Sequence, residues 1–294
     1  MAKRAQAGTW VGISGWTYAG WRRVFYPEGL PHRRELEYVG SRMNSVEING
    51  SFYSLQRPTS YRHWYEQTPA RFVFAVKGSR FITHMKKLKD VETALANFFA
   101  SGVLRLADKL GPVLWQFPER MRFDEERFAR FLEMLPCTHA AAAELARGHD
   151  ERMEGRSWVE PEHEGAIRHA FEVRNPGFMD AAFVDLLRAH GAALVFADTA
   201  GRWPYAEDVT ADFVYVRLHG AEHLYASGYT DPQLDWWASR IREWRAGCQP
   251  RDAACVASPA ADARGGRDVY VYFDNDAKVH APFDAIRLAE RLRA

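Results

Sequence analysis

The sequence contains little cysteine, with only Cys137, Cys248 and Cys255 among its 294 residues. These three form neither a disulfide framework nor a metal-binding spacing, and such sparse use is typical of proteins of the reducing cytoplasm. The chain also lacks an apolar run long enough to span a bilayer, and its first eight residues lack the apolar stretch of a secretory signal. We therefore expect a cytoplasmic protein with no membrane partner.

Net charge is nearly absent as well, because the formal charge at pH 7 is +1. This balance argues against a general nucleic-acid binder, although it permits a local basic patch. The chain has no P-loop and no zinc-finger pattern, and the segment from Gly12 to Trp16 lacks the G-x-G-x-x-G spacing of a dinucleotide-binding loop. What the chain does contain is apolar material, at 47% of its residues, which suffices for a large globular core.

Short apolar runs alternate along the chain with longer stretches of helical periodicity. The runs are rich in β-branched or aromatic residues and are bounded by turn residues or charges, as buried parallel strands are. The longer stretches carry apolar residues three and four positions apart, as amphipathic helices do. We predict strands over residues 10–14, 45–48, 72–76, 113–116, 170–173, 193–197, 213–218 and 269–273. We predict helices over residues 33–43, 60–67, 91–107, 124–135, 181–190, 232–244 and 282–293.

Repeated alternation of strand and helix around eight strands is what a closed parallel barrel requires. We therefore predict an α/β fold, a single (β/α)₈ TIM-type barrel domain over residues 9–294, preceded by a tail over residues 1–8. A doubly wound open sheet is the alternative, which the missing phosphate loop disfavours. The link over 199–212 is too rich in Gly and Pro for a good helix.

Two segments of low periodicity, 138–165 and 247–267, are interpreted as surface insertions. The first is rich in Ala, Glu and His, and we interpret His139, His149 and His163 as surface residues and not as ligands. The second is rich in Ala, Pro, Gly and Asp, which is typical of a flexible excursion.

Side chains of barrel strands alternate between the interior and the helix layer. In the seventh predicted strand the aliphatic residues face the helices, so Tyr215, Arg217 and His219 face inward. Since buried charges are costly unless paired, these groups form either a charge-balanced structural network or a binding site, and the carboxyl end of the strands carries the active site in barrel enzymes. The same alternation predicts inward polar residues at the carboxyl ends of all eight strands, namely Ser14, Glu47 with Asn49, Lys77, Gln116, Glu172 with Arg174, Asp198, Arg217 with His219, and Asp274.

Short motifs follow one another along the chain in an ordered set. They are Gly-Ile-Ser-Gly-Trp over 12–16, Phe-Tyr-Pro over 25–27, Val-Glu-Ile-Asn-Gly-Ser-Phe-Tyr over 46–53, Phe-Ala-Val-Lys over 74–77, Gln-Phe-Pro over 116–118, Phe-Glu-Val-Arg over 171–174, Val-Arg-Leu-His-Gly over 216–220 and Tyr-Phe-Asp-Asn-Asp over 272–276. This set resembles the signature blocks of the YecE-like family, domain of unknown function 72. The resemblance implies a TIM-type barrel and no established reaction. The last block of that family more often begins with Asn, where this chain has Asp274, which argues against an obligatory metal-ligand or general-base role there.

The favoured hypothesis is an enzyme that binds a small anionic or polyol ligand, such as a sugar phosphate or a nucleotide fragment. Lys77, Arg174 and Arg217 would hold the anion through charge-assisted hydrogen bonds. Glu47 or Glu172 would be the general base, and His219 would transfer protons near neutral pH. The predicted catalytic residues are Glu47, Glu172, His219 and Asp274, and the predicted ligand-binding residues are Trp16, Asn49, Tyr53, Lys77, Gln116, Arg174, Asp198, Arg217 and Asn275. Aromatic residues after the first two strands would stack on a ring of the ligand or pack within the loops, namely Trp16, Tyr18, Trp21, Phe52 and Tyr53.

Alternatives come from other classes. A divalent-metal-dependent isomerase or phosphodiesterase would use carboxylates and His219 as ligands, but three cations share the ring and would repel a metal ion, so no cofactor is expected. A non-catalytic protein that binds a ligand or nucleic acid would use the basic run over 80–89, a pattern that more often marks a solvated loop. A retaining glycosidase is the weakest alternative, because the fourth strand ends in Gln116 and not in a carboxylic acid. In the metal-dependent alternative, the ligands would be Glu47, Glu172, Asp198, His219 and Asp274.

Overall fold

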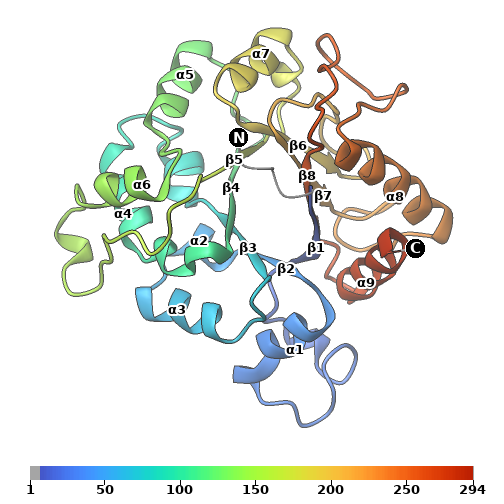
Figure 1. Cartoon of the computed structure of the whole chain (residues 1–294), viewed down its shortest axis with the longest axis horizontal. Helices are drawn as coiled ribbons and strands as arrows, with labels where there is room; N and C mark the ends of the chain where they lie inside the picture. The colour runs from blue at the N-terminus through green and yellow to red at the C-terminus, as the bar shows by residue number, and fades with distance from the viewer. Residues whose placement is uncertain (1–6, 294) are drawn as a thin grey trace.

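The computed structural model describes residues 7–293 and contains eight parallel strands that close into a barrel. Each strand pairs with its neighbours in sequence, and β8 pairs with β1 to complete the ring (Figure 1). The predicted TIM-type barrel is confirmed, while residues 1–6 of the predicted tail, and residue 294, lie outside the described residues. The strands are β1 Thr9–Ser14, β2 Ser45–Ile48, β3 Val73–Lys77, β4 Leu110–Gln116, β5 His169–Glu172, β6 Ala193–Asp198, β7 Phe213–Leu218 and β8 Asp268–Phe273.

Helices surround the barrel on its outer side (Figure 1). The predicted helix over 91–107 is interrupted after Ala100, because Gly102 adopts a φ of 108° and the chain continues in a 3₁₀ segment, Val103–Lys109. Between β6 and β7 no helix forms, as predicted, and within residues 7–293 every helix falls short of the length or hydrophobicity that a bilayer crossing requires. The α-helices of the described residues are α1 Glu35–Arg42, α2 Gly50–Tyr53, α3 Pro58–Glu66, α4 Glu92–Ala100, α5 Glu125–Met134, α6 His139–Ala146, α7 Ala181–Ala189, α8 Asp231–Ala246 and α9 His280–Arg293.

The strands separate two apolar cores. Outward-facing strand residues pack against the helices, and inward-facing residues fill the barrel itself. In β7, Val214, Val216 and Leu218 belong to the outer core and Tyr215 to the inner one, as the alternation predicts. Because side chains fill the interior, a ligand site can form only at an end of the barrel. The inner core consists of Ala75, Leu114, Ala170, Ala193, Val195, Ala197, Phe213, Tyr215, Tyr270 and Tyr272.

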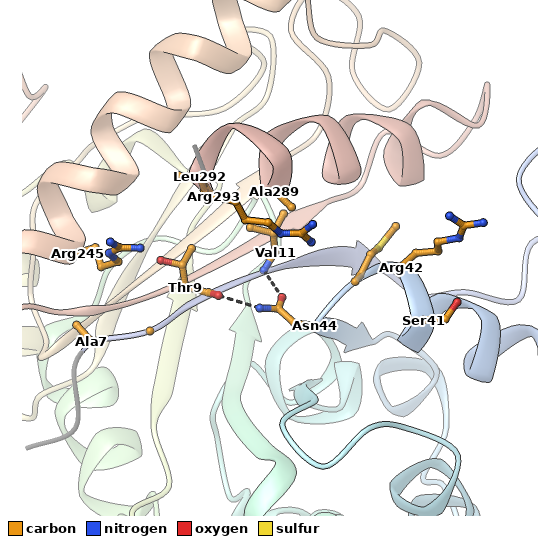
Figure 2. Close-up of a pocket in the computed structure, with 12 residues that line it drawn as sticks. Ala7, Thr9, Val11, Ser41, Arg42, Asn44, Arg245, Ala289, Leu292 and Arg293 are labelled. Atoms are coloured by element: carbon orange, nitrogen blue, oxygen red, sulfur yellow. Dashed lines mark hydrogen bonds between the residues drawn. The ribbon is translucent and has the colours of Figure 1, made fainter.

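The junction of β1 and β2 depends on two small features of the sequence. Gly12 pairs with Ser45, and a Cβ atom at Gly12 would lie 2.0 Å from the Ser45 carbonyl oxygen, so that the close approach requires glycine. Asn44 directly precedes β2. Its side-chain amide donates to the backbone carbonyl of Thr9 at 2.9 Å and accepts from the backbone N–H of Val11 at 2.8 Å (Figure 2). The Asn44 side chain thereby extends the hydrogen-bonded contact beyond the first paired residues.

The two predicted insertions are more ordered than expected. Segment 138–165 contains α6, and His139 is buried within it, so its assignment to the surface is wrong, whereas His163 is exposed. Segment 247–267 has neither helix nor strand, but the buried Asp208 carboxylate accepts hydrogen bonds from the amides of Val256 and Ala257 at 2.8 and 2.9 Å. These bonds attach the middle of the surface insertion to the link between β6 and β7.

Candidate functional site

A fully buried arginine organises the carboxyl end of the barrel. Arg217 of β7 is 0% exposed and donates to Glu47 of β2 at 2.8 Å, to Glu172 of β5 at 2.5 Å and to Asp274, just after β8, at 2.9 Å. A further bond of 3.1 Å reaches Ser14 of β1. One side chain therefore links β7 to β1, β2, β5 and the end of β8, and we call Arg217 with its three carboxylates the arginine hub.

The Glu47 carboxylate is saturated by donors from the protein. Its oxygens accept hydrogen bonds from Ser14 at 2.6 Å, from the Tyr215 hydroxyl at 2.7 Å and from two nitrogens of Arg217 at 2.8 and 3.1 Å. Glu47 is also 0% exposed. A ligand has no access to it, which speaks against the predicted role of Glu47 as a general base and favours a role in positioning Arg217.

The other two hub carboxylates are weak bases. Burial raises the pKa of Glu172, but Arg217 and Arg174 outweigh that effect and hold it well below its ordinary value. In Asp274, Arg217 and His219 likewise outweigh burial and lower the pKa to about 2. The His219 ring is 0% exposed, with its Nδ1 atom 3.0 Å from an Asp274 oxygen. Both carboxylates are therefore ionised at neutral pH but bind a proton weakly, and this low basicity speaks against the predicted role of Glu172 as a general base.

A cavity of about 680 Å³ lies at the carboxyl ends of the strands, next to the hub. Strand β3 and the segment after it contribute Lys77 and Arg80, which we call the cationic wall. The segment after β8 contributes Asp274 and Asp276, which we call the acidic wall. Charges of opposite sign thus enter one cavity from different strands. The remaining lining residues are Tyr18, Asn49, Phe52, Tyr53, His84, Met85, Gln116, Arg174 and Tyr225.

The two residues of the cationic wall make no direct contact with a carboxylate of the described residues. Within residues 7–293, neither Lys77 nor Arg80 forms an ion pair, and each lies over an aromatic ring instead. Lys77 Nζ is 4.5 Å from the centre of the Phe52 ring, and the Arg80 guanidinium carbon is 5.4 Å from that of Tyr53. Aromatic faces attract cations weakly, so both groups remain available to an anion.

The other predicted anion ligands are already engaged. Arg174 donates to Glu172 at 3.0 Å and to the Tyr225 hydroxyl at 3.3 Å, and its guanidinium lies 3.7 Å from the centre of a Trp203 ring. Arg174 still lines the cavity, whereas Arg217 is enclosed by its partners in the hub. The geometry therefore speaks against the predicted contact between Arg217 and a ligand.

The groups that line the cavity differ in how their pKa values are shifted. Burial, followed by the charge of Arg217, lowers the pKa of Lys77 to about 8. Burial and the charge of Lys77 lower the pKa of His84 to about 4, so that this ring is neutral near pH 7. Burial and the neighbouring Asp274 raise the pKa of Asp276 to about 6. Asp276 is consequently the carboxyl group of the cavity best suited to exchange a proton near neutral pH.

Two predicted site residues face away from the cavity. The alternation in β6 turns Ala197 inward, so the expectation that Asp198 faces the barrel is wrong, and its carboxylate accepts a hydrogen bond from the Tyr229 hydroxyl at 2.9 Å. Asn275 is fully buried and donates to Asp284 at 2.9 Å. This amide holds the start of the segment after β8 against α9, and its predicted contact with a ligand is not supported.

Trp16 lies in an adjoining cavity of about 520 Å³ that shares Tyr18, Asn49 and Tyr53 with the first one. The Asn49 Oδ1 atom is buried and has no hydrogen-bond partner within residues 7–293, so it can accept from a ligand. Gln116 lines the main cavity while donating to the carbonyl of Phe117 at 2.7 Å. The structure thus brings Asn49, Tyr53, Lys77, Gln116, Arg174 and Asp274 together and sets Trp16 beside them.

Sequence reasoning left several lining residues out of the site. Arg80 and His84 were assigned to a solvated basic loop, but the π-helical segment Phe81–Met85 keeps them at the cavity. Such segments are rare and are frequently found at functional sites. Their short distance in sequence from Lys77 was a usable signal. The sequence gives no comparable signal for Tyr225, because its position depends on a loop in which its own φ is 64°.

A metal centre finds no support in this arrangement. Within residues 7–293, no three His, Cys, Asp or Glu side chains come together as a metal site would require. Glu47, Glu172 and Asp274, which were considered as ligands, are bound to Arg217 instead.

Another cavity, of about 490 Å³, lies at the opposite end of the barrel beside Thr9, where β1 begins, and we call it the amino-end cavity. Figure 2 shows Arg245 and Arg42 at opposite sides of it, with Arg293 between them. In barrel proteins this amino end serves stability, whereas catalysis takes place at the carboxyl end. We therefore take the cavity that holds the cationic and acidic walls as the candidate site.

The fold and this cavity define a TIM-barrel protein with a charged site at the carboxyl ends of its strands. The chain belongs to the family described as "Protein of unknown function DUF72", whose model it matches over residues 10–294. It is similar to UPF0759 protein YecE of Escherichia coli (strain K12), with 23% identity over 243 residues, 80% of this chain and 81% of YecE. It is also similar to UPF0759 protein YunF of Bacillus subtilis (strain 168), with 27% identity over 114 residues, 37% of this chain but only 39% of YunF.

Solved structures of the family share the fold. The DUF72 family protein TM1631 of Thermotoga maritima MSB8 superposes with a TM-score of 0.73 at 23% identity, covering 98% of this chain and 100% of that one. The DUF72 family protein EF0366 of Enterococcus faecalis V583 gives a TM-score of 0.70 at 14% identity, covering 97% and 96%. The family inferred from the ordered motifs is thereby confirmed.

Proposed function

We propose that this protein is an enzyme whose substrate is a small polyol or sugar that carries a phosphate or a similar anionic group. The anionic group would bind at the cationic wall, and the hydroxyl groups would face the acidic wall. The single observation that carries the proposal is that two cations line one cavity without an ion pair within residues 7–293, namely the buried Lys77 and the exposed Arg80. For the buried Lys77 the lack of an ion-pair partner is costly, and an incoming anion lowers that cost.

The dimensions and chemistry of the cavity support this class of ligand. A volume of about 680 Å³ falls within the range of roughly 300–1,000 Å³ typical of small-molecule sites. Arginine binds phosphate through paired hydrogen bonds and lysine binds it as a point charge, so Arg80 and Lys77 complement each other. The Asp276 carboxylate and the unpartnered oxygen of Asn49 are acceptors for hydroxyl groups.

Of the hub residues, only Asp274 lines the cavity and would face the substrate, while Arg217, Glu47 and Glu172 would act by holding it in place. Arg217 keeps Asp274 ionised and fixed, while Glu47 holds Arg217 in place. Asp276, with its pKa of about 6, is the candidate for proton exchange with a bound hydroxyl or carbonyl group. Rigid support of this kind is what a reactive group needs to keep a productive geometry.

Thermal unfolding in the presence of ligands tests the proposal. We expect glucose 6-phosphate, glycerol 3-phosphate or a nucleoside monophosphate to raise the Tm of the purified protein, because a ligand of the folded state stabilises it. Glucose and glycerol should leave the Tm unchanged. Arg80→Met and Lys77→Met should each weaken binding about tenfold or more, as expected for the loss of a charge-assisted hydrogen bond.

Arg71→Met is the matched control. Arg71 is exposed and precedes β3, whereas Lys77 ends it, so this variant removes a cation from the opposite end of the same strand. Its response to phosphorylated ligands should equal that of the wild type. A Tm that no phosphorylated compound shifts, or a shift that survives intact in both cavity variants, would contradict the proposal.

A further inference from the structure

Two lysines of the described residues are buried, in contrasting surroundings. Lys77 and Lys109 are 8% and 4% exposed. The Lys109 ammonium donates to the carbonyls of Tyr65 and Thr68 at 2.6 and 2.8 Å and to the Thr68 hydroxyl at 3.1 Å, so its three N–H groups are all used. Within residues 7–293, Lys77 Nζ has no hydrogen bond and no ion pair, and Lys77 lines the cavity. The described residues therefore satisfy the Lys109 ammonium as a structural cation, whereas they leave the Lys77 ammonium without a hydrogen-bond or ion-pair partner.

The surroundings of Lys77 increase the fraction of its amine that is neutral. Burial and the nearby Arg217 lower its pKa to about 8, against the opposing charges of Glu172, Glu47 and Asp274. The other charged or titratable groups of the cavity are Arg80, Arg174, His84 and Asp276. Each unit by which a lysine pKa falls raises the neutral fraction at a given pH about tenfold. The neutral amine is the nucleophilic form, and a lysine becomes reactive when it is desolvated beside another cation.

We propose that Lys77 is a nucleophile that forms an imine with the carbonyl group of an aldehyde or ketone substrate. The inference rests on the proposed function and narrows its substrate class to phosphorylated or otherwise anionic carbonyl compounds. Arg80 holds the anionic group while Lys77 meets the carbonyl carbon. Because the protonated imine carries the same positive charge as the ammonium, the cationic wall keeps its charge throughout.

The step balances without an oxidant or a reductant. The Nζ lone pair forms a bond to the carbonyl carbon, the electrons of the C=O π bond move to oxygen, and one nitrogen proton is transferred to that oxygen to give a carbinolamine. An acid then protonates the hydroxyl group, which leaves as water while the nitrogen lone pair forms the C=N bond. Asp276 lines the same cavity and, with its pKa of about 6, can supply that proton near neutral pH.

Reductive trapping tests the inference. The full chain is incubated with dihydroxyacetone phosphate or, separately, with pyridoxal 5′-phosphate, reduced with cyanoborohydride and mapped by peptide mass spectrometry. We expect the adduct on Lys77, with occupancy at least about tenfold above that of the exposed Lys89 and Lys278, as the lowered pKa implies. Lys109 is the internal control for burial alone and should remain unmodified.

Lys77→Arg separates the two proposals, because arginine keeps the charge and cannot form the imine. The variant should retain the Tm shift caused by phosphorylated ligands and lose the adduct. If phosphorylated ligands stabilise the wild type through Arg80 but the adduct is confined to exposed lysines, imine formation is overturned and the proposed function stands. If neither stabilisation nor an adduct is found, both are overturned.

Discussion

At the scale of single residues, Arg217 binds three carboxylates at once. Its guanidinium contacts Glu47, Glu172 and Asp274 where water has no access to the guanidinium itself. Three acids around one cation leave the hub with an excess of negative charge, which Arg174 and Lys77 help to offset. The hub is therefore stable only as a complete set, because removing a partner leaves a buried charge uncompensated.

Arg217→Met tests this directly. The variant should lose about 3–5 kcal/mol or more of unfolding free energy at pH 7, the range found when one partner of a buried ion pair is removed. Urea unfolding followed by circular dichroism measures the change. Arg34→Met is the control, because Arg34 pairs with Glu37 at the exposed surface, and its stability should match the wild type. A loss below about 1 kcal/mol for Arg217→Met, the level of a surface pair, would contradict a central role for this arginine.

The raised pKa of Asp276 predicts that the stability of the protein depends on pH. Its pKa is raised on folding from 3.8 to about 6, so the folded protein binds this proton more tightly than the unfolded chain does. The contribution to stability is full below about pH 4 and is lost as the pH rises through about 6. Asp276→Asn cannot lose a proton, so its stability relative to the wild type should improve between pH 4 and pH 7. Urea unfolding at both pH values checks this, and equal differences would show that Asp276 titrates normally.

At the scale of elements, strand spacing in the barrel depends on Gly12. Ala at this position would place a Cβ atom 2.0 Å from a backbone oxygen of β2, and a strand of a closed barrel has no free side toward which to move. Gly12→Ala should lower the unfolding free energy by about 3 kcal/mol or more, at or beyond the upper end of ordinary overpacking. Gly20→Ala, where a Cβ atom meets nothing within 4 Å, is the matched control. Similar stability of the two variants in urea unfolding would contradict the predicted clash.

The strands themselves could be predicted from sequence, because alternating apolar residues mark both their existence and their faces. Strand β7 shows this, since its aliphatic residues identify the outer face and leave Arg217 pointing inward. The same reasoning failed in β6, because its inward residues, such as Ala197, are apolar like its outward residues, such as Phe196. Asp198 was therefore assigned to the wrong face.

The depth of a side chain within the barrel mouth could not be predicted from alternation. Glu47 and Lys77 both face inward, yet Glu47 lies in the hub, whereas Lys77 lines the cavity. The difference depends on which donors surround each group, and these come from strands distant in sequence, such as Tyr215. Loop residues were harder still, because Tyr225 reaches the site through a conformation that no local pattern indicates.

At the scale of the whole molecule, a net charge of +1 conceals a local separation of charge. The cationic wall and the acidic wall lie at the carboxyl end of the barrel, while the arginines of the amino-end cavity lie at the other end (Figure 2). Both ends could attract anions by charge alone. What distinguishes the carboxyl end is the burial of an unpaired lysine above a rigid, internally paired hub.

The most direct measurement is the position of a phosphate-like anion in a crystal of this protein soaked with tungstate, which anomalous scattering locates without ambiguity. We expect the anion in the cavity of the carboxyl end, in contact with Lys77 and Arg80. Its absence there, with an anion bound instead beside Arg42, Arg245 or Arg293 at the amino end, would contradict the proposed site.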